Sequence, residues 1–286
     1  MHVERPSTGD LPPLYRVSDR AAGTYQRKFL AATTVQLVAL VGTSLGAAMS
    51  LPLGVAGSLA IATFARIFLL STHPERAWYE SRALAESSKS LAWRYAVGGD
   101  PFSVDSAGPE VRLANRLKAT SRLAKTAALE GDIEGPAVTK WMRDLRAMPL
   151  ATRRGAYSQD RVASQQSWYS SRARVNGQRA SRLMLAMILL QLATLLTAIL
   201  SSTSLVATSA AGVVASVCAA LAIWLQARQH ETLAASYALT AVELGGVLTS
   251  LEGDPSEADW ARLVDEAEEA MSREHTTWQA TRFDPR

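Results

Sequence analysis

Two long runs without a charged side chain constrain the fold of this chain more than any other feature. Residues 29–65 and residues 183–227 contain no Asp, Glu, Lys, Arg or His. A helix needs about 20 apolar residues to cross the hydrocarbon core of a membrane, so each run is about twice the length of one span. Each run therefore predicts a hairpin of two transmembrane helices, over about residues 29–72 and 183–227.

The charges around the two hairpins predict their orientation. Pro52 marks the first turn, because proline cannot continue the hydrogen bonding of a helix, and the serine-rich SSTS that begins at Ser201 marks the second. Neither turn carries a charge, whereas the outer flanks are rich in Arg and Lys, and such flanks remain in the cytoplasm. We therefore expect a multi-pass protein of the inner (cytoplasmic) membrane, with both termini and the central region in the cytoplasm.

The overall composition agrees with a membrane protein. Of the 286 residues, 48% are hydrophobic and 20% are charged, which is too apolar for an ordinary soluble chain. A soluble bundle that buries its apolar helices is an alternative, and it would be found in the soluble fraction without detergent. The net charge of +4 follows from Arg-rich cytoplasmic flanks, so we expect no nucleic-acid partner.

The two halves of the chain are similar to each other. QLVALVGTSL begins at Gln36 and QLATLLTAIL begins at Gln191, while GGDP at residues 98–101 recurs as EGDP at residues 252–255, at an offset of about 155 residues. Two matches at one offset predict a duplicated unit that contains a lead-in helix, a hairpin and an exit helix. We place the first unit at residues 1–130, a linker at 131–138 and the second unit at 139–286.

The segments outside the hairpins are also predicted to be helical. WYESRALAESSKSLAWRY contains no Gly or Pro, and the glycines at 98 and 99 end it as they end many helices. A last helix is predicted over residues 257–282, with Trp260, Val264 and Met271 among its apolar positions. The fold class is therefore an all-α membrane protein with four transmembrane helices as two hairpins and a cytoplasmic helical bundle.

The chemistry of an enzyme is not visible in the sequence. The single cysteine, Cys218, lies inside an apolar run, and the chain has no glycine-rich phosphate loop. The histidines share no spacing that would form a base, a nucleophile or a metal cage, and they are His2, His73, His230 and His275. We expect neither catalysis nor a cofactor nor a metal site.

Aromatic and polar side chains share helical faces in the predicted cytoplasmic bundle. One face carries Tyr157, Arg161, Gln165, Trp168, Arg172 and Asn176 at steps of three or four residues. Similar mixtures occur in the first exit helix and in the last helix, at Glu86, Lys89, Trp93, Glu274 and Trp278. Packing within the bundle is the favoured interpretation, and a surface for a ligand or partner is the alternative.

Polar side chains also occur inside the predicted spans. Gln36 and Gln191 hold equivalent places in the two hairpins; a bond across helices is the favoured interpretation of each, and the lining of a wet path is the alternative. Arg66 lies near the cytoplasmic end of its span, so snorkelling is the favoured interpretation and pore lining the alternative. Gly42 and Gly46, four residues apart, predict close packing of helices.

The segment after the first hairpin, RAWYESRALAESSKSLAWRYAVGGDPF, resembles the exit helix of the SLATT family, the SMODS and SLOG-associating two-transmembrane effectors. WMRDLRAMPLATRRGAYSQDRVASQQSWYSSRARVNGQRA is similar to the lead-in of another SLATT subtype, and SREHTTWQATR is similar to its C-terminal end. The chain therefore resembles two SLATT units in tandem.

The resemblance implies an inner-membrane effector of a bacterial conflict or antiphage system, which permeabilises the membrane after a nucleotide sensor detects infection. It implies a nucleotide synthase or nucleotide sensor as partner, and no catalytic residues. Small residues in GVAGSLA and AAGVVASVCAA favour close helix contacts, so we expect the pore to be a homo-oligomer. A membrane-anchored scaffold that recruits a cytosolic partner without conducting is the alternative.

Overall fold

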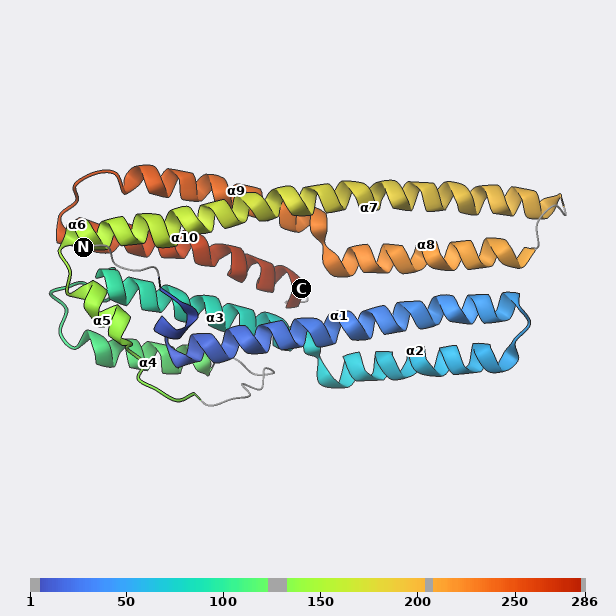
Figure 1. Ribbon diagram of the computed structural model, residues 1–286, viewed down its shortest axis with the longest axis horizontal. Coiled ribbons are helices and arrows are strands. Elements are labelled where there is room, and N and C mark those ends of the chain that lie inside the picture. Colours follow the sequence, from blue (N-terminus) through green and yellow to red (C-terminus); the bar gives the residue numbers. More distant parts are fainter. Residues whose placement is uncertain (1–5, 123–132, 204–207, 284–286) are drawn as a thin grey trace. The chain divides into compact units, whose positions relative to one another are not determined.

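The computed structural model describes the backbone of residues 6–122, 133–203 and 208–283. It describes the side chains of the same residues, apart from those of 208 and 273–283. Regular structure within these ranges is helical, and no strand occurs in them. The elements in chain order (Figure 1) are η1 (Thr8–Asp10), α1 (Pro13–Ala48), α2 (Pro52–Thr72), α3 (Pro74–Val97), α4 (Pro109–Ser121), α5 (Lys140–Arg146), α6 (Leu150–Ala156), the π-helix η2 (Tyr157–Ala163), α7 (Ser164–Ser202), α8 (Thr208–Arg228), α9 (His230–Ser250) and α10 (Glu257–Phe283).

The chain divides into two compact units. One, here called the bundle unit, comprises Met1–Tyr25, Arg76–Arg172 and Ser236–Arg286. The other, here called the membrane unit, comprises Gln26–Glu75 and Ala173–Ala235. Helices α1, α3, α7 and α9 contain residues of both units without interruption.

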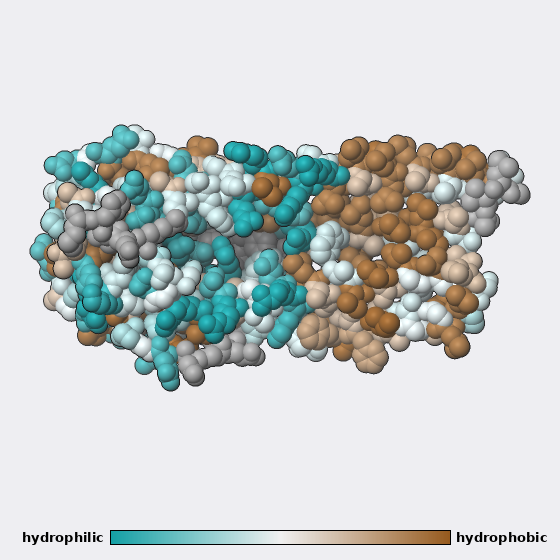
Figure 2. Space-filling model, viewed as in Figure 1, coloured by the Kyte–Doolittle hydropathy of each residue, from teal (hydrophilic) through white to brown (hydrophobic). Residues whose placement is uncertain are grey.

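The membrane unit consists of two antiparallel hairpins, α1 with α2 and α7 with α8 (Figure 1). In the described part of the chain, four helical segments are long and apolar enough to cross a membrane. Large apolar side chains of this unit face outward, including Leu53 at 88% and Phe64 at 73% exposure, and Figure 2 shows apolar residues gathered over its surface. A soluble protein rarely exposes so wide an apolar surface, so the predicted all-α membrane fold with four spans in two hairpins is confirmed.

The first hairpin packs through its glycines, as predicted. A Cβ atom added to Gly46 would lie 3.2 Å from the backbone nitrogen of Val55, and one added to Gly42 would lie 3.1 Å from Ser58 Oγ. Both distances are shorter than ordinary van der Waals contact. The two glycines therefore allow α1 and α2 to approach closely.

The two halves of the membrane unit also repeat in detail. Helices α2 and α8 have 21 residues each. Each is followed by a residue in the left-handed region, His73 at φ 43° and Gln229 at φ 46°. These two breaks are 156 positions apart, close to the offset of the sequence matches, so the duplication predicted from the sequence extends to the backbone.

The bundle unit has an aromatic core that joins helices far apart in sequence. The ring centroid of Trp93 in α3 lies 5.1 Å from that of Trp141 in α5 and 6.0 Å from that of Tyr157 in η2. Tyr157 in turn lies 5.7 Å from Trp260 in α10. Edge-to-face pairs at such distances stabilise a core by about 0.5–1.5 kcal/mol each beyond their buried area.

The C-terminal end of α3 is fixed inside this core. Gly98, at φ 78°, ends the helix, as the sequence predicted. The carbonyl oxygen of Val97 accepts hydrogen bonds from Trp260 Nε1 at 2.7 Å and from Arg153 Nη1 at 2.7 Å. A carbonyl that would otherwise be buried without a partner is thereby satisfied twice.

The region between the predicted units is described in part. Residues 133–139 form no helix, and α5 begins at Lys140. Positions 131 and 132 of the predicted linker lie outside the described residues. The linker at 131–138 stays a prediction.

Candidate functional site

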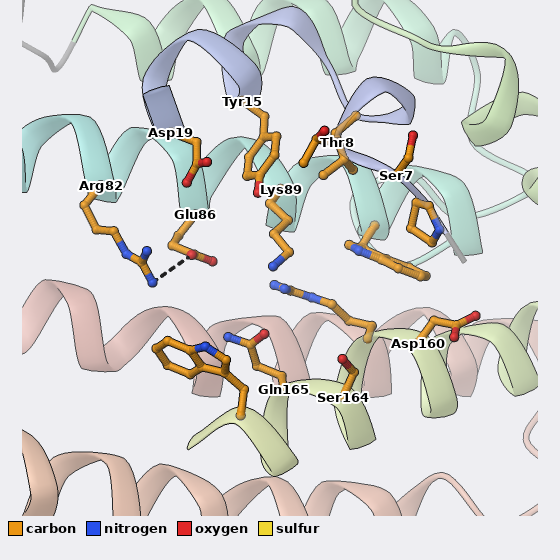
Figure 3. A pocket seen from close by; sticks show the side chains of 15 residues that line it. Ser7, Thr8, Tyr15, Asp19, Arg82, Glu86, Lys89, Asp160, Ser164 and Gln165 are labelled. Atoms are coloured by element: carbon orange, nitrogen blue, oxygen red, sulfur yellow. Dashed lines mark ion pairs between the residues drawn. The ribbon is translucent and has the colours of Figure 1, made fainter. Parts of the chain in front are cut away.

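A pocket of about 300 Å³ opens between four segments of the bundle unit. Its walls come from the segment around η1, from α1, from α3 and from the run of η2 into α7 (Figure 3). The pocket brings together predicted candidates from two separate helical faces, namely Glu86, Lys89 and Trp93 of α3 with Arg161, Gln165 and Trp168 of η2 and α7.

The helix that carries Arg161 departs from the predicted α-helical register. Tyr157–Ala163 forms a π-helix, in which one turn contains more residues than an α-helical turn. The sequence pattern of three- and four-residue steps did not anticipate this change. Short π-helical segments often occur at functional sites, because the wider turn redirects side chains.

Arg161 is held by a buried acid. It is 3% exposed, and its Nε and Nη2 atoms donate to Glu268 Oε1 at 2.9 Å and Oε2 at 2.7 Å. The hydroxyl of Tyr157 donates to Glu268 Oε1 at 3.0 Å. The remaining guanidinium nitrogen, Arg161 Nη1, is buried and has no hydrogen-bond partner among the described residues.

These contacts determine the charge states at the base of the pocket. Burial and the Glu268 carboxylate raise the pKa of Tyr157 well above its usual value, so its hydroxyl stays a donor. Burial is the largest single effect on the pKa of Arg161 and lowers it, but the charge and hydrogen bonds of Glu268, together with the charge of Glu86, outweigh burial and the pKa is raised. The guanidinium is therefore charged at neutral pH.

Lys89 lies beside this arginine on the α3 wall. Burial lowers the pKa of its ammonium group, and the positive charge of Arg161 lowers it further. Farther along α3, Arg82 Nη2 pairs with Glu86 Oε1 at 3.2 Å. The pocket therefore combines two ion-paired arginines, Arg82 and Arg161, with the Lys89 ammonium, which forms no ion pair with a described residue.

Aromatic rings complete the wall of the pocket. Trp93 is 2% exposed, whereas Trp168 is half-buried. The ring of Trp168 lies edge to face with Tyr169 at 5.1 Å and with Tyr237 at 5.5 Å. The guanidinium of Arg172 lies 5.4 Å from the centroid of Trp168, which holds that ring from the side.

The other candidates lie apart from the pocket. Gln36, Arg66 and Gln191 belong to the membrane unit; Gln36 is half-buried, and Arg66 and Gln191 are exposed. Among the described residues neither glutamine forms a hydrogen bond to another helix, so the favoured cross-helix bond is not observed within one chain. Glu274 and Trp278 are in α10, but their side chains lie outside the described residues.

Glu268 and Arg153 were not among the candidates predicted from the sequence. Glu268 is fully buried, four residues after Val264 on the apolar face of α10, so an acid on an apolar stripe was the available signal. Arg153 is 2% exposed, donates to Met148 O at 3.0 Å and forms an ion pair with Glu257. Nothing in its local sequence distinguishes it from the exposed arginines nearby.

Paired apolar hairpins with a helical bundle define a multi-pass membrane protein built from two two-span units. The family model of SMODS and SLOG-associating 2TM effector domain 3 matches residues 12–154, and that of SMODS and SLOG-associating 2TM effector domain 1 matches residues 157–278. The first match covers half of the chain, and the chain belongs to the SLATT family, with two SLATT domains in tandem. No curated protein and no solved structure matches it.

The family defines the broad role of the chain. SLATT domains are two-transmembrane effector domains associated with conflict systems, so this protein is a membrane effector. The pocket has walls from both domains, since α1 and α3 lie in the first match and η2 and α7 in the second.

Proposed function

We propose that this protein permeabilises the bacterial inner membrane as an oligomeric pore when a nucleotide-linked sensor of an antiphage system triggers it. The observation that carries the proposal is the continuity of α1 and α7. Each helix contributes to the pocket in the bundle unit and continues into an apolar segment long enough to cross a membrane. A change at the bundle end of such a helix is transmitted along its length, because helices are stiff.

A pore formed by several copies accounts for the polar side chains of the membrane unit. Gln191 is exposed, and neither it nor Gln36 has a hydrogen-bond partner among the described residues of one chain. An amide that faces lipid without a partner is costly. Copies arranged around an axis along the membrane normal would place these amides in one wet space, where water satisfies them.

Arg66, near the end of α2, is compatible with the proposed ring of copies in two roles. It is exposed on α2, six residues before the helix ends at Thr72, which is about 9 Å along the axis. An arginine at that depth reaches the headgroups by snorkelling, which is the favoured interpretation, or contributes charge to the mouth of a pore.

The proposed role requires no catalysis by this chain and no nucleic acid. Its partners are the membrane, further copies of itself and a nucleotide synthase or nucleotide sensor. The Arg-rich flanks of the hairpins support a cytoplasmic location for both termini and the bundle unit, where such a sensor would act.

Expression in cells that carry a potential-sensitive dye tests the proposal. We expect the triggered protein to depolarise the membrane, and Gln191→Leu to reduce the effect. Thr194→Val is the matched control, because the Thr194 hydroxyl already donates to Leu190 O at 2.8 Å within its own helix. An intact potential together with capture of a cytosolic partner would instead support the non-conducting scaffold.

A further inference from the structure

Three polar groups of the pocket have no partner in the described part of the chain. Arg161 Nη1 is buried without a hydrogen bond, although the rest of its side chain is held by Glu268. The Lys89 ammonium forms no ion pair, and the Gln165 amide forms no hydrogen bond, with any described residue. A buried donor without a partner, such as Arg161 Nη1, is rare in folded proteins, and two half-buried donors, Lys89 and Gln165, line the same pocket, so the three together point to a missing acceptor.

The charges around these donors are unevenly distributed. Arg82 and Glu86 neutralise each other, and Glu268 neutralises Arg161 from behind. In Figure 3, Lys89 extends from α3 into the middle of the pocket, with Asp19 and Glu86 drawn to one side of it and Asp160 to the other. Among the described residues that line the pocket, Lys89 is therefore the cation that no ion pair neutralises.

Two neighbouring cations are unfavourable to each other in this pocket. The charge of Arg161 contributes to the lowered pKa of Lys89, after burial, and Arg161 Nη1 is left without a hydrogen bond. The π-helix that carries Arg161 is itself a rare backbone form that occurs often at functional sites. Such local conflicts are typical of binding sites, where the ligand completes the hydrogen bonds.

We propose that this pocket binds a small molecule through a phosphate or carboxylate group placed between Lys89 Nζ and Arg161 Nη1. Both side chains are strong donors to such anions. The Gln165 amide adds a neutral donor on the same wall. The remaining volume, bounded by Tyr15 and Trp168, accommodates an uncharged part of the molecule.

Binding would connect the two SLATT domains. Lys89 belongs to the first domain, and Arg161 and Gln165 belong to the second. An anion that contacts both sides favours the arrangement in which α3 and η2 are held together. This consequence rests on the proposed function, since it makes the ligand the signal that the effector receives.

Calorimetric titration of the full-length protein in detergent micelles tests the binding directly. The probes are inorganic pyrophosphate and citrate, each compared with chloride at the same ionic strength, so that a phosphate-bearing ligand is distinguished from a carboxylate-bearing one. We expect saturable binding of at least one probe. The proposal would be overturned if neither probe, at concentrations up to about 10 mM, gave more heat of binding than chloride does.

Three variants locate the bound anion. Lys89→Gln removes a charge without disturbing the Arg161–Glu268 pair, and we expect the affinity to fall about tenfold or more. Lys89→Arg keeps the cation and should retain binding within a few-fold. Lys140→Gln is the control, because Lys140 is exposed, pairs with Asp144 and does not line the pocket, so the affinity of this variant should equal that of the wild type.

Equal loss in Lys89→Gln and Lys140→Gln, or no loss in either, would assign the binding to surface charge and contradict the site. Circular dichroism melting of each variant verifies that it is folded. Because binding is measured without a membrane potential, it is independent of depolarisation. Binding without depolarisation would support the anion site and contradict the pore. Depolarisation without binding would support the pore and contradict the anion site.

Discussion

Arg161 and Glu268 form two parallel hydrogen bonds, Nε to Oε1 at 2.9 Å and Nη2 to Oε2 at 2.7 Å, across 107 positions of sequence. Arg161 lies in η2 and Glu268 in α10, so the pair joins the start of the second lead-in helix to the last helix. Exposure is 3% for Arg161 and 0% for Glu268. A buried pair with this geometry is strongly directional, and it fixes the orientation of the arginine that lines the pocket.

The first prediction concerns this pair. Arg161→Met leaves the Glu268 carboxylate buried without its cation, so we expect a loss of about 3–5 kcal/mol in the free energy of unfolding. Adding Glu268→Leu to it should recover a large part of the loss, because two apolar groups replace both charges. Urea unfolding in detergent measures the stability of the single and the double variant. Lys140→Met is the control, because it breaks an exposed ion pair, and it should cost less than about 1 kcal/mol. An Arg161→Met variant as stable as Lys140→Met would contradict the prediction.

Gly99 provides a test of the packing between α3 and α10. A Cβ atom at this position would overlap with Val264 Cγ1, so Gly99→Ala should destabilise the bundle unit by about 1–3 kcal/mol. Gly155→Ala is the matched control, because nothing lies within 4 Å of its added Cβ atom and alanine favours a helix by up to about 1 kcal/mol. Thermal unfolding followed by circular dichroism should move the two midpoints in opposite directions.

The two tryptophans of the pocket should differ in their effect on stability. Trp93 is 2% exposed within the aromatic core, so Trp93→Ala should cost about 3–5 kcal/mol. Trp168 is half-buried, and its truncation should cost clearly less. Equal and negligible changes in melting would mean that neither ring is packed in the folded protein.

The orientation in the membrane can be tested with introduced cysteines. Ser50 and Ser202 are exposed at the ends of the hairpins, and Ser7 is exposed at the N-terminal segment. In a Cys218→Ala background, a membrane-impermeant maleimide applied from outside the inner membrane should label Ser50→Cys and Ser202→Cys but not Ser7→Cys. Labelling of Ser7→Cys from outside would reverse the topology.

Assembly can be tested by cross-linking in native membranes. The pore proposal predicts a ladder of bands above the monomer, since one chain has too few spans to enclose a wet path while its helices stay packed. The exposed apolar surface of the membrane unit, for example around Leu53 and Phe64, provides the contacts. A strictly monomeric protein that still depolarises cells would refute the ring of copies.

The sequence by itself determined the fold class, the hairpins and the tandem family membership. Runs without charge imply spans for a reason that needs no tertiary information, because each residue of a span must be compatible with lipid. The turn at Pro52, the end of α3 at Gly98 and the repeat offset were likewise local properties of the chain. The helical faces around Trp93 and Arg161 could also be listed as candidates from spacing alone.

Tertiary structure decided which of those candidates meet. Spacing along one helix cannot tell which other helix it contacts, so the approach of Lys89 to Arg161 and the burial of Glu268 behind them depend on packing. The sequence pattern also did not predict the π-helix at Tyr157–Ala163, because its seven residues have no distinctive composition, and Tyr157 and Arg161 contact Glu268 only in the folded chain. The pocket is therefore a property of the packed bundle, in which side chains from distant parts of the chain enclose a space that none of them encloses alone.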